Sequence, residues 1–325
     1  MGAKSNIEWT DSSWTPIRAR DKIAPDRVGW HCEHVSEACR NCYAESMNRR
    51  LGTGLDYKPG NLDAVDIFLD EKMLLAPLRW RKPRKIFVCS TTDLFGDWVR
   101  DEWIDRVFVT MARAGQHTFQ LLTKRPGRMR EYISAFAPDG DGFITRGGTL
   151  AMYGDTPIDA PIFAANRWPL PNVWLGTTAE DEEHYRQRWA HMAAVPATVR
   201  FLSYEPALGP IGDLDLGRVG APNWIIAGGE SGPHARPSHP EWFRSLRDQC
   251  KAAGVPFFFK QWGEWLGTSD DNGSISYGSH KRHGWDIDGP KEEWAYRVGK
   301  SRAGRLLDGV EHSEFPPTST GMEER

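Results

Sequence analysis

Short runs of β-branched and aromatic residues alternate with amphipathic stretches along most of this chain. Seven such runs are predicted as strands, at residues 14–18, 85–90, 118–123, 172–177, 199–203, 223–227 and 256–260. Helical patterns occupy residues 41–51, 101–114, 181–194 and 240–253. Strands that alternate with helices at this spacing are typical of a parallel sheet of βα units. We therefore expect an α/β fold, a complete or partial TIM-like (β/α) barrel with a cysteine-bearing loop near its N-terminus.

The length and the local composition suggest how the chain is divided. Its 325 residues fit one barrel of about 250 residues together with extensions. We expect the barrel to occupy residues 1–266. A segment rich in Gly, Pro and Asp, at about 137–171, is predicted as an insertion loop, and residues 267–325 as a C-terminal extension.

Three cysteines, Cys32, Cys39 and Cys42, lie within eleven residues, in the stretch GWHCEHVSEACRNCYAE. A structural zinc site normally has four protein ligands, so three thiolates leave one coordination position open. A four-iron cluster that is held by three cysteines likewise keeps one iron available. The other two cysteines, Cys89 and Cys250, are distant in sequence. The spacing therefore predicts one metal centre with an open position.

The composition indicates a globular protein of a reducing compartment. The chain has only five cysteines and no N-terminal apolar run that resembles a signal peptide, so we expect it in the cytoplasm. A reducing compartment favours metal binding over a disulfide for clustered cysteines. No stretch approaches the roughly 20 apolar residues that a membrane span needs. The net charge of −3 gives no general attraction to nucleic acid, so any such contact must be local.

Polar residues follow each predicted strand, where a βα barrel carries its chemistry. Seven strands that end in charged or hydroxyl groups point to one shared polar pocket. The residues at these ends include Ser90, Thr92 and Asp93, Lys124, Thr177 and Glu180, Glu205, Gly228, Gly229 and Glu230, and Lys260, Gln261 and Trp262.

The cysteine cluster and several signposts resemble a known superfamily. Three close cysteines, the last two as Cys-x-x-Cys followed by Tyr43, resemble the radical S-adenosylmethionine (SAM) enzymes, and the whole chain is similar to a phage-associated three-Cys-motif group near them. The matching segments are NIEWTDSSWTP, CRNCYAE, TTDLFGDWV, TFQLLTKRP, VWLGTT, FLSYEP, IIAGGESGPHARP, FFFKQWGEW and VGKSRAGRLLDGVEHSEFP. The spacing departs from the common Cys-x3-Cys-x2-Cys, because six residues separate Cys32 from Cys39, and Asn41 replaces the usual aromatic residue.

The resemblance implies a barrel of the radical SAM type and a chemistry. Cys32, Cys39 and Cys42 would hold a 4Fe-4S cluster, whose fourth iron binds SAM and whose electron yields a 5′-deoxyadenosyl radical. The expected SAM-binding residues are Ser90, Thr92 and Asp93 at the methionyl end, Thr177 and Glu180 at the ribose, and the motif Gly228, Gly229 and Glu230. In the superfamily a Gly-Gly-Glu motif often follows the second strand, whereas here it follows the sixth. We expect Glu205 and Lys260 to act in catalysis, and Lys124, Arg236, Gln261 and Trp262 to bind the substrate.

Two basic clusters bear on the partner. The run at 79–85 contains Arg79, Arg81, Lys82 and Arg84, but it precedes a strand, so a solvated helix end is the favoured interpretation. The cluster at 124–130 follows a strand, on the expected active face, and could hold a phosphate backbone. We therefore expect a nucleic-acid or nucleotide substrate and an external electron donor, with DNA hypermodification by an isomerase or a repair-like lyase as the reaction.

A second function class stays open. His31 or His34 could complete a Cys3His zinc site, which would make the chain a non-catalytic, nucleic-acid-associated module. The polar strand ends favour the enzyme, because a zinc knuckle leaves them without a role.

Overall fold

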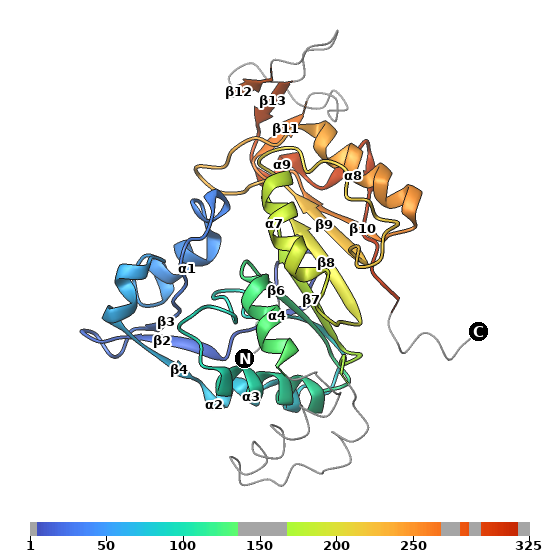
Figure 1. Ribbon diagram of the computed structural model, residues 1–325. Coiled ribbons are helices and arrows are strands. Elements are labelled where there is room, and N and C mark those ends of the chain that lie inside the picture. Colours follow the sequence, from blue (N-terminus) through green and yellow to red (C-terminus); the bar gives the residue numbers. More distant parts are fainter. Residues whose placement is uncertain (1–4, 136–167, 268–279, 286–293, 318–325) are drawn as a thin grey trace. The chain divides into compact units, whose positions relative to one another are not determined.

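The computed structural model describes residues 5–135, 168–267, 280–285 and 294–317 (Figure 1). Its main sheet has seven strands, hydrogen-bonded in the order β1-β5-β6-β7-β8-β9-β10. Their bounds are β1 Ser12–Trp14, β5 Lys85–Val88, β6 Thr118–Thr123, β7 Val173–Thr178, β8 Val199–Tyr204, β9 Trp224–Gly228 and β10 Phe257–Gln261. The described α-helices are α1 Tyr43–Leu51, α2 Glu71–Leu74, α3 Asp101–Arg113, α4 Pro126–Ser134, α7 Glu182–Met192, α8 Pro240–Ala253 and α9 Lys300–Ala303.

The chain divides into two compact units. Unit 1 contains residues 1–177, 194–200 and 317–325, and unit 2 contains residues 178–193 and 201–316. The predicted insertion loop at about 137–171 lies outside the described residues except for its last four. Residues 267–316, most of the predicted C-terminal extension, cluster with unit 2.

The prediction of a TIM-like barrel is wrong. A TIM barrel closes on itself and places a helix after each of its eight strands. Here β1 and β10 are the two ends of an open strand order, and the fully described stretch between β8 and β9 contains no helix. The alternating sequence pattern predicts parallel strands, and the strands do pair in parallel within each unit. The pattern does not indicate whether the sheet closes into a barrel.

The strand predicted at 14–18 is two strands that belong to different sheets. β1 ends at Trp14, and β2 (Ile17–Asp21) pairs antiparallel with β3 (Val28–Gly29) and with β4 (Val65–Leu69). Pro16 lies between β1 and β2, where a residue without a backbone N–H interrupts a strand. The other six strands and the four helices predicted from sequence are confirmed, with ends that differ by at most two residues.

In unit 1 the sheet β1-β5-β6-β7 carries the core. Helix α3 buries its Ile104 and Phe108, and the Phe108 ring stacks on Tyr132 of α4 at 5.9 Å between ring centroids. On β1, the Trp14 ring packs against Phe119 of β6 at 5.5 Å. None of the described helices is long and apolar enough to cross a membrane.

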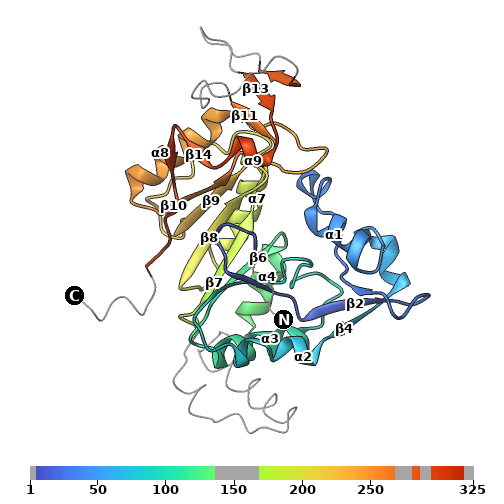
Figure 2. The same cartoon turned by 180° about the vertical axis from the view of Figure 1, so that it is seen from behind.

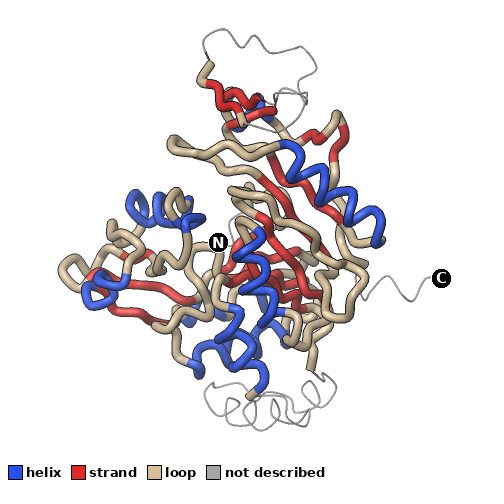
Figure 3. Tube along the Cα trace, turned by 45° about the horizontal axis from the view of Figure 1, so that its top comes forward, coloured by secondary structure: helices blue, strands red, loops and turns tan. Residues whose placement is uncertain are grey.

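The small sheet β3-β2-β4 and helix α1 form a lobe to one side of β1-β5-β6-β7 (Figures 2 and 3). The fully buried Asn48 of α1 joins them. Its Oδ1 accepts from the backbone N–H of Trp30 at 3.0 Å, and its Nδ2 donates to the Thr53 hydroxyl at 2.8 Å. A side chain at Gly29 would place its Cβ 2.3 Å from Asn48 Oδ1, so only glycine fits where this helix meets the sheet.

In unit 2 the strands β8, β9 and β10 pair in parallel, and α8 packs against β9 and β10. Helix α8 ends at Gly254, whose left-handed φ of 66° suits glycine. A bulge lies in β10 at Lys260, between Phe259 and Gln261. Two small sheets complete the described part of this unit: β11 (Trp265–Gly267), β13 (Trp294–Arg297) and β12 (Arg282–Gly284), and β14 (Leu306–Leu307) with β15 (Val310–Glu311).

Candidate functional site

The three clustered cysteines lie on one loop of unit 1, between β3 and α1. Cys39 ends a short 3-10 helix (Glu37–Cys39), and Cys42 is the residue before the first turn of α1. Cys39 is buried, whereas Cys32 and Cys42 are partly exposed. The loop therefore presents its thiols from a compact turn, and we call residues 31–43 the cysteine loop.

The three thiols lie within electrostatic range of one another. Burial raises the pKa of Cys32 well above its usual value, and the charges of Asp93, Cys42 and Cys39 raise it further, while Arg125 lowers it. Burial likewise raises the pKa of Cys42, which hydrogen bonds from the backbone of Glu45 and Ala44 partly offset, and Lys124 lowers it too. A basic side chain is thus close to each of these two thiols.

The thiols are not gathered as a metal site in this conformation. Among the described residues, no group of three His, Cys, Asp or Glu side chains is placed to hold a metal ion. His34, one of the two candidate zinc ligands, lies 3.4 Å from Glu45 Oε2 through its Nε2. His31 is buried, with its ring edge against Trp98 at 5.0 Å between centroids.

The cysteine loop is fixed to the residues that follow β5. The Thr92 hydroxyl donates to the carbonyl of His31, and the Tyr43 hydroxyl donates to the carbonyl of Ser90 at 2.6 Å. Cys89 follows β5 with a left-handed φ of 55°, which turns the chain into the segment that carries Ser90 and Thr92. Ser90 and Thr92, predicted to bind SAM, therefore come together with the cysteines, and they contact the loop itself.

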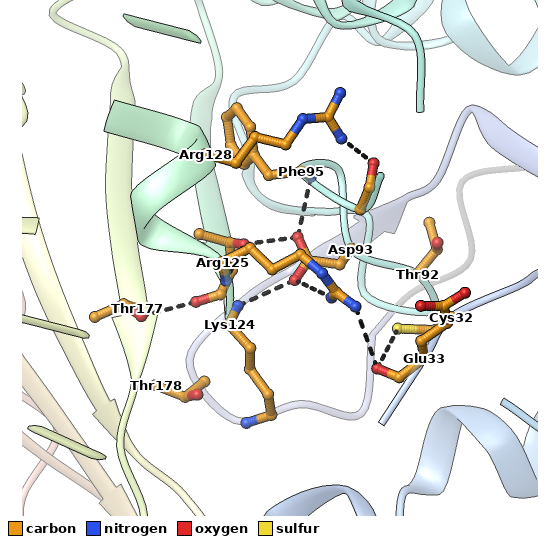
Figure 4. Close-up of polar contacts among 12 residues, drawn as sticks. Cys32, Glu33, Thr92, Asp93, Phe95, Lys124, Arg125, Arg128, Thr177 and Thr178 are labelled. Atoms are coloured by element: carbon orange, nitrogen blue, oxygen red, sulfur yellow. Dashed lines mark hydrogen bonds and ion pairs between the residues drawn. The ribbon is translucent and has the colours of Figure 1, made fainter. Parts of the chain in front are cut away.

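Asp93 anchors the second connection, between the cysteine loop and β6 (Figure 4). Its carboxylate accepts from the Thr123 hydroxyl at 2.7 Å, and from the backbone N–H groups of Phe95 at 3.0 Å and Lys124 at 3.1 Å. It also forms an ion pair with Arg125, at 3.2 Å from Nη1 to Oδ2. Four donors surround this buried carboxylate, so in this structure Asp93 braces the site.

Arg125 carries that connection to the cysteine loop. Its Nη2 donates to the carbonyl of Glu33 at 3.4 Å, and its guanidinium lies over the Trp98 ring at 4.8 Å from the centroid. Lys124, which the sequence assigns to substrate binding, extends away from Asp93 (Figure 4). Thr177, predicted at the ribose, is fully buried and donates its hydroxyl to the carbonyl of Thr123 at 2.8 Å.

In unit 2, Glu205 and Lys260, both predicted to act in catalysis, form an ion pair. Lys260 Nζ lies 3.0 Å from Glu205 Oε1, and Glu205 Oε2 accepts from the Ser203 hydroxyl at 3.2 Å. The bulge in β10 sets Lys260 and Gln261 opposite the end of β9, and bulges commonly re-aim side chains next to functional sites. Gln261 Oε1 is buried without a hydrogen-bond partner among the described residues.

The glycines at the end of β9, Gly228 and Gly229, have a packing role in this arrangement. A Cβ on Gly228 would lie 2.7 Å from Glu205 Oε1, and one on Gly229 would lie 2.0 Å from the backbone oxygen of Trp262. Both residues were predicted to contact a cofactor. In the structure each of them allows a close approach between the ends of β8, β9 and β10.

We expect Gly229→Ala to destabilise the protein by about 1–3 kcal/mol, because its added Cβ would lie 2.0 Å from the backbone oxygen of Trp262, which cannot turn aside as the end of a side chain can. Gly217→Ala is the matched control, since nothing lies within 4 Å of its added Cβ. Denaturant unfolding of both variants measures the difference. Equal stabilities for the two variants would contradict this packing role.

The other predicted residues of unit 2 bind one another or are enclosed. Glu230 accepts from Arg236 through both carboxylate oxygens, at 2.6 and 2.8 Å. Glu180 is fully buried and pairs with Arg188 at 2.8 Å. Trp262 is buried and donates its Nε1 to the carbonyl of Leu306 at 2.8 Å, so its ring is enclosed in this conformation.

A family model described as "Protein of unknown function (DUF5131)" matches residues 4–316, nearly the whole chain. The chain belongs to this family. A search of curated proteins and a search of solved structures found no match. The DUF5131 match therefore establishes the family and leaves its chemistry to the residues themselves.

Sequence reasoning missed three residues of this DUF5131 protein that hold predicted site residues in place, Arg125 and Tyr57 in unit 1 and Arg188 in unit 2. Arg125 was considered only as part of a basic cluster, and Arg188 and Tyr57 were not singled out. Tyr57 is buried and donates its hydroxyl to the carbonyl of Thr91 at 2.7 Å. A single sequence offers one signal for Arg125, its place directly after a strand.

Proposed function

We propose that this protein is an iron-sulfur enzyme of the radical SAM kind, which acts on a nucleobase or a modified nucleotide. In this proposal Cys32, Cys39 and Cys42 hold a 4Fe-4S cluster. The observation that carries the proposal is the cysteine loop itself: one loop bears three thiols and is fixed by hydrogen bonds to the residues that follow β5 and β6.

The donor set fits such a group in its chemistry. Thiolates are the usual protein ligands of iron-sulfur clusters, and three of them leave one iron open to a small molecule. Burial raises the pKa values of Cys32 and Cys42, and the neighbouring Arg125 and Lys124 offset part of that rise. The thiols would have to draw closer than they lie here, and the loop that bears them contains no regular strand or long helix that would prevent this.

Each neighbouring residue has a definable task around the cysteines. When bound, a 4Fe-4S cluster supplies the reducing electron and the open iron site. Arg125 and Asp93 position the loop that carries Cys32. Lys124, near Cys42, supplies positive charge that suits a carboxylate or phosphate of a bound small molecule. An external electron donor and the cytoplasm of a bacterial or phage-infected cell belong to the same proposal.

The residue pair in unit 2 can handle protons or bind an anion. Lys260 and Glu205 lie 3.0 Å apart and are each less than one fifth exposed. A lysine and a carboxylate at this distance can share or pass a proton to a group placed beside them. We assign this pair to substrate chemistry, with isomerase or lyase activity on a modified base as the reaction class.

The experiment is anaerobic reconstitution of the purified chain with ferrous iron and sulfide, followed by dithionite and SAM. We expect a brown protein with about four irons per chain and formation of 5′-deoxyadenosine. A colourless protein that retains zinc and forms no 5′-deoxyadenosine would instead support the alternative, a Cys3His zinc module completed by His31 or His34.

A further inference from the structure

The structure separates the two basic clusters by what their side chains already bind. In the cluster at 124–130, Arg125 is held by Asp93 and by the carbonyl of Glu33. Arg128 donates to the carbonyl oxygens of Gly96 and Val99, the latter at 2.6 Å, and pairs with Asp101 at 3.3 Å. Two of the cationic groups expected to meet phosphate are thus engaged within unit 1.

The run at 79–85 presents its charges differently. Arg79, Arg81 and Lys82 are exposed, and none of them forms an ion pair with any residue in the described part of the chain. We call these three residues the basic edge. Arg84 of the same run is engaged within the protein. Its guanidinium lies over the Trp80 ring at 4.8 Å from the centroid, and its Nη1 donates to the Ser12 hydroxyl at 3.3 Å.

The backbone under the basic edge is held in place. The carbonyl of Trp80 accepts from Gln116 Nε2 at 3.1 Å, and a 3-10 helix (Pro77–Arg79) precedes it. Pro83 follows the edge and restricts the chain there. Fixed backbone beneath solvated cationic side chains lowers the ordering cost of binding a polyanion, because only the side-chain ends remain to be immobilised.

We propose that the basic edge docks the phosphate backbone of a nucleic acid. This rests on the proposed function for the class of substrate, and it adds the surface that holds it. The chain has a net charge of −3, so attraction to phosphate has to come from a local surface such as this one. Residues 79–82 span at most about 11 Å, so their three charges are close enough together to meet neighbouring phosphates of one strand.

The basic edge and the cysteine loop lie at opposite ends of β5, so we assign docking to the first and chemistry to the second. The run enters β5 at Lys85, whereas the cysteine loop contacts residues beyond the other end of β5. A nucleic acid can therefore bind the edge without displacing the groups that hold the cysteines. Binding at this edge does not require a cluster, so it is measurable in the metal-free protein.

The test compares Arg79→Ala/Arg81→Ala/Lys82→Ala with a control triple, Arg50→Ala/Arg186→Ala/Lys251→Ala, which removes the same charge from exposed positions elsewhere. Fluorescence anisotropy with labelled oligothymidylate and with a duplex of mixed sequence is measured over a salt series. For the single strand we expect the basic-edge triple to reduce the slope of log affinity against log salt by about 2, since each phosphate contact contributes about 0.7. The control triple should keep the parent slope.

Several outcomes would overturn the proposal. Equal loss in both triples would assign binding to net charge alone. A parent protein that binds anionic lipid vesicles and no oligonucleotide would assign the surface to another partner. If Lys124→Ala/Arg130→Ala reduced the salt dependence while the basic-edge triple kept it, nucleic acid would bind the cluster at 124–130, as the sequence predicts, and not the basic edge.

Iron content and thermal melting, measured on the same variants, keep the two proposals apart. Loss of oligonucleotide binding in the basic-edge triple with iron uptake at the parent level supports the basic edge. A parent that binds oligonucleotide at this edge but takes up no iron would leave the docking surface standing and defeat the iron-sulfur function. If the basic-edge triple has a lowered melting temperature, the single variants Arg81→Ala and Lys82→Ala replace it in the test. Each of them should reduce the slope of log affinity against log salt by about 0.7.

Discussion

Each of the single variants Cys32→Ala, Cys39→Ala and Cys42→Ala should have an iron content near zero after reconstitution. A cluster that is held by three thiolates loses one of its bound irons with each replacement, and no other cysteine lies on the cysteine loop. Iron and sulfide assays with the visible absorption spectrum measure the effect. This is the largest change that we expect from any single substitution.

Cys89→Ala and Cys250→Ala are the matched controls for that series. Both residues are buried, and neither lies on the cysteine loop. Their variants should bind iron like the parent. Loss of iron at all five positions alike, or at none of the three in the loop, would remove the basis of the iron-sulfur proposal.

Asp93→Ala should destabilise the protein by about 3–5 kcal/mol, because it leaves Arg125, whose side chain is only 13% exposed, without its partner charge. The change also removes the acceptor for the Thr123 hydroxyl and for two backbone N–H groups. Thermal melting and denaturant unfolding measure the loss. We expect the cysteine loop to become accessible as well, which thiol labelling of Cys32 would show.

Asp101→Ala provides the comparison for Asp93. Asp101 also pairs with an arginine, Arg128 at 3.3 Å, but its side chain is 49% exposed. Removing an exposed partner typically costs about 0–1 kcal/mol. Should both variants lose the same stability, the buried carboxylate would not be the brace that its hydrogen bonds indicate.

The secondary structure could be predicted because its signals are local. The alternation of apolar residues in 118–123 and the pattern from 240 onward depend on neighbours within one strand or helix. The first strand was wrong for a tertiary reason. Residues 14–18 have one continuous β pattern, yet Trp14 pairs with β5 while Ile17 pairs with β4 in another sheet.

The grouping of polar residues at strand ends was partly predictable. That the cysteines, Ser90, Thr92 and Asp93 come together follows from the order of strands that pair in parallel. What each side chain binds did not follow. Glu230 and Arg236 are six residues apart and were assigned to two different ligands, yet they bind each other.

The sequence by itself determined the positions of six strands of the main sheet, of helices α1, α3, α7 and α8 but not of α4, and of the single loop that bears three thiols, because each is encoded within a few consecutive residues. Only the tertiary structure decided that the sheet is open, that Asp93 binds Arg125, and that Arg128 is engaged while Arg81 is exposed. Ion pairs and sheet closure depend on residues that are distant in the chain, and a charge in the sequence carries no mark of the partner that will neutralise it.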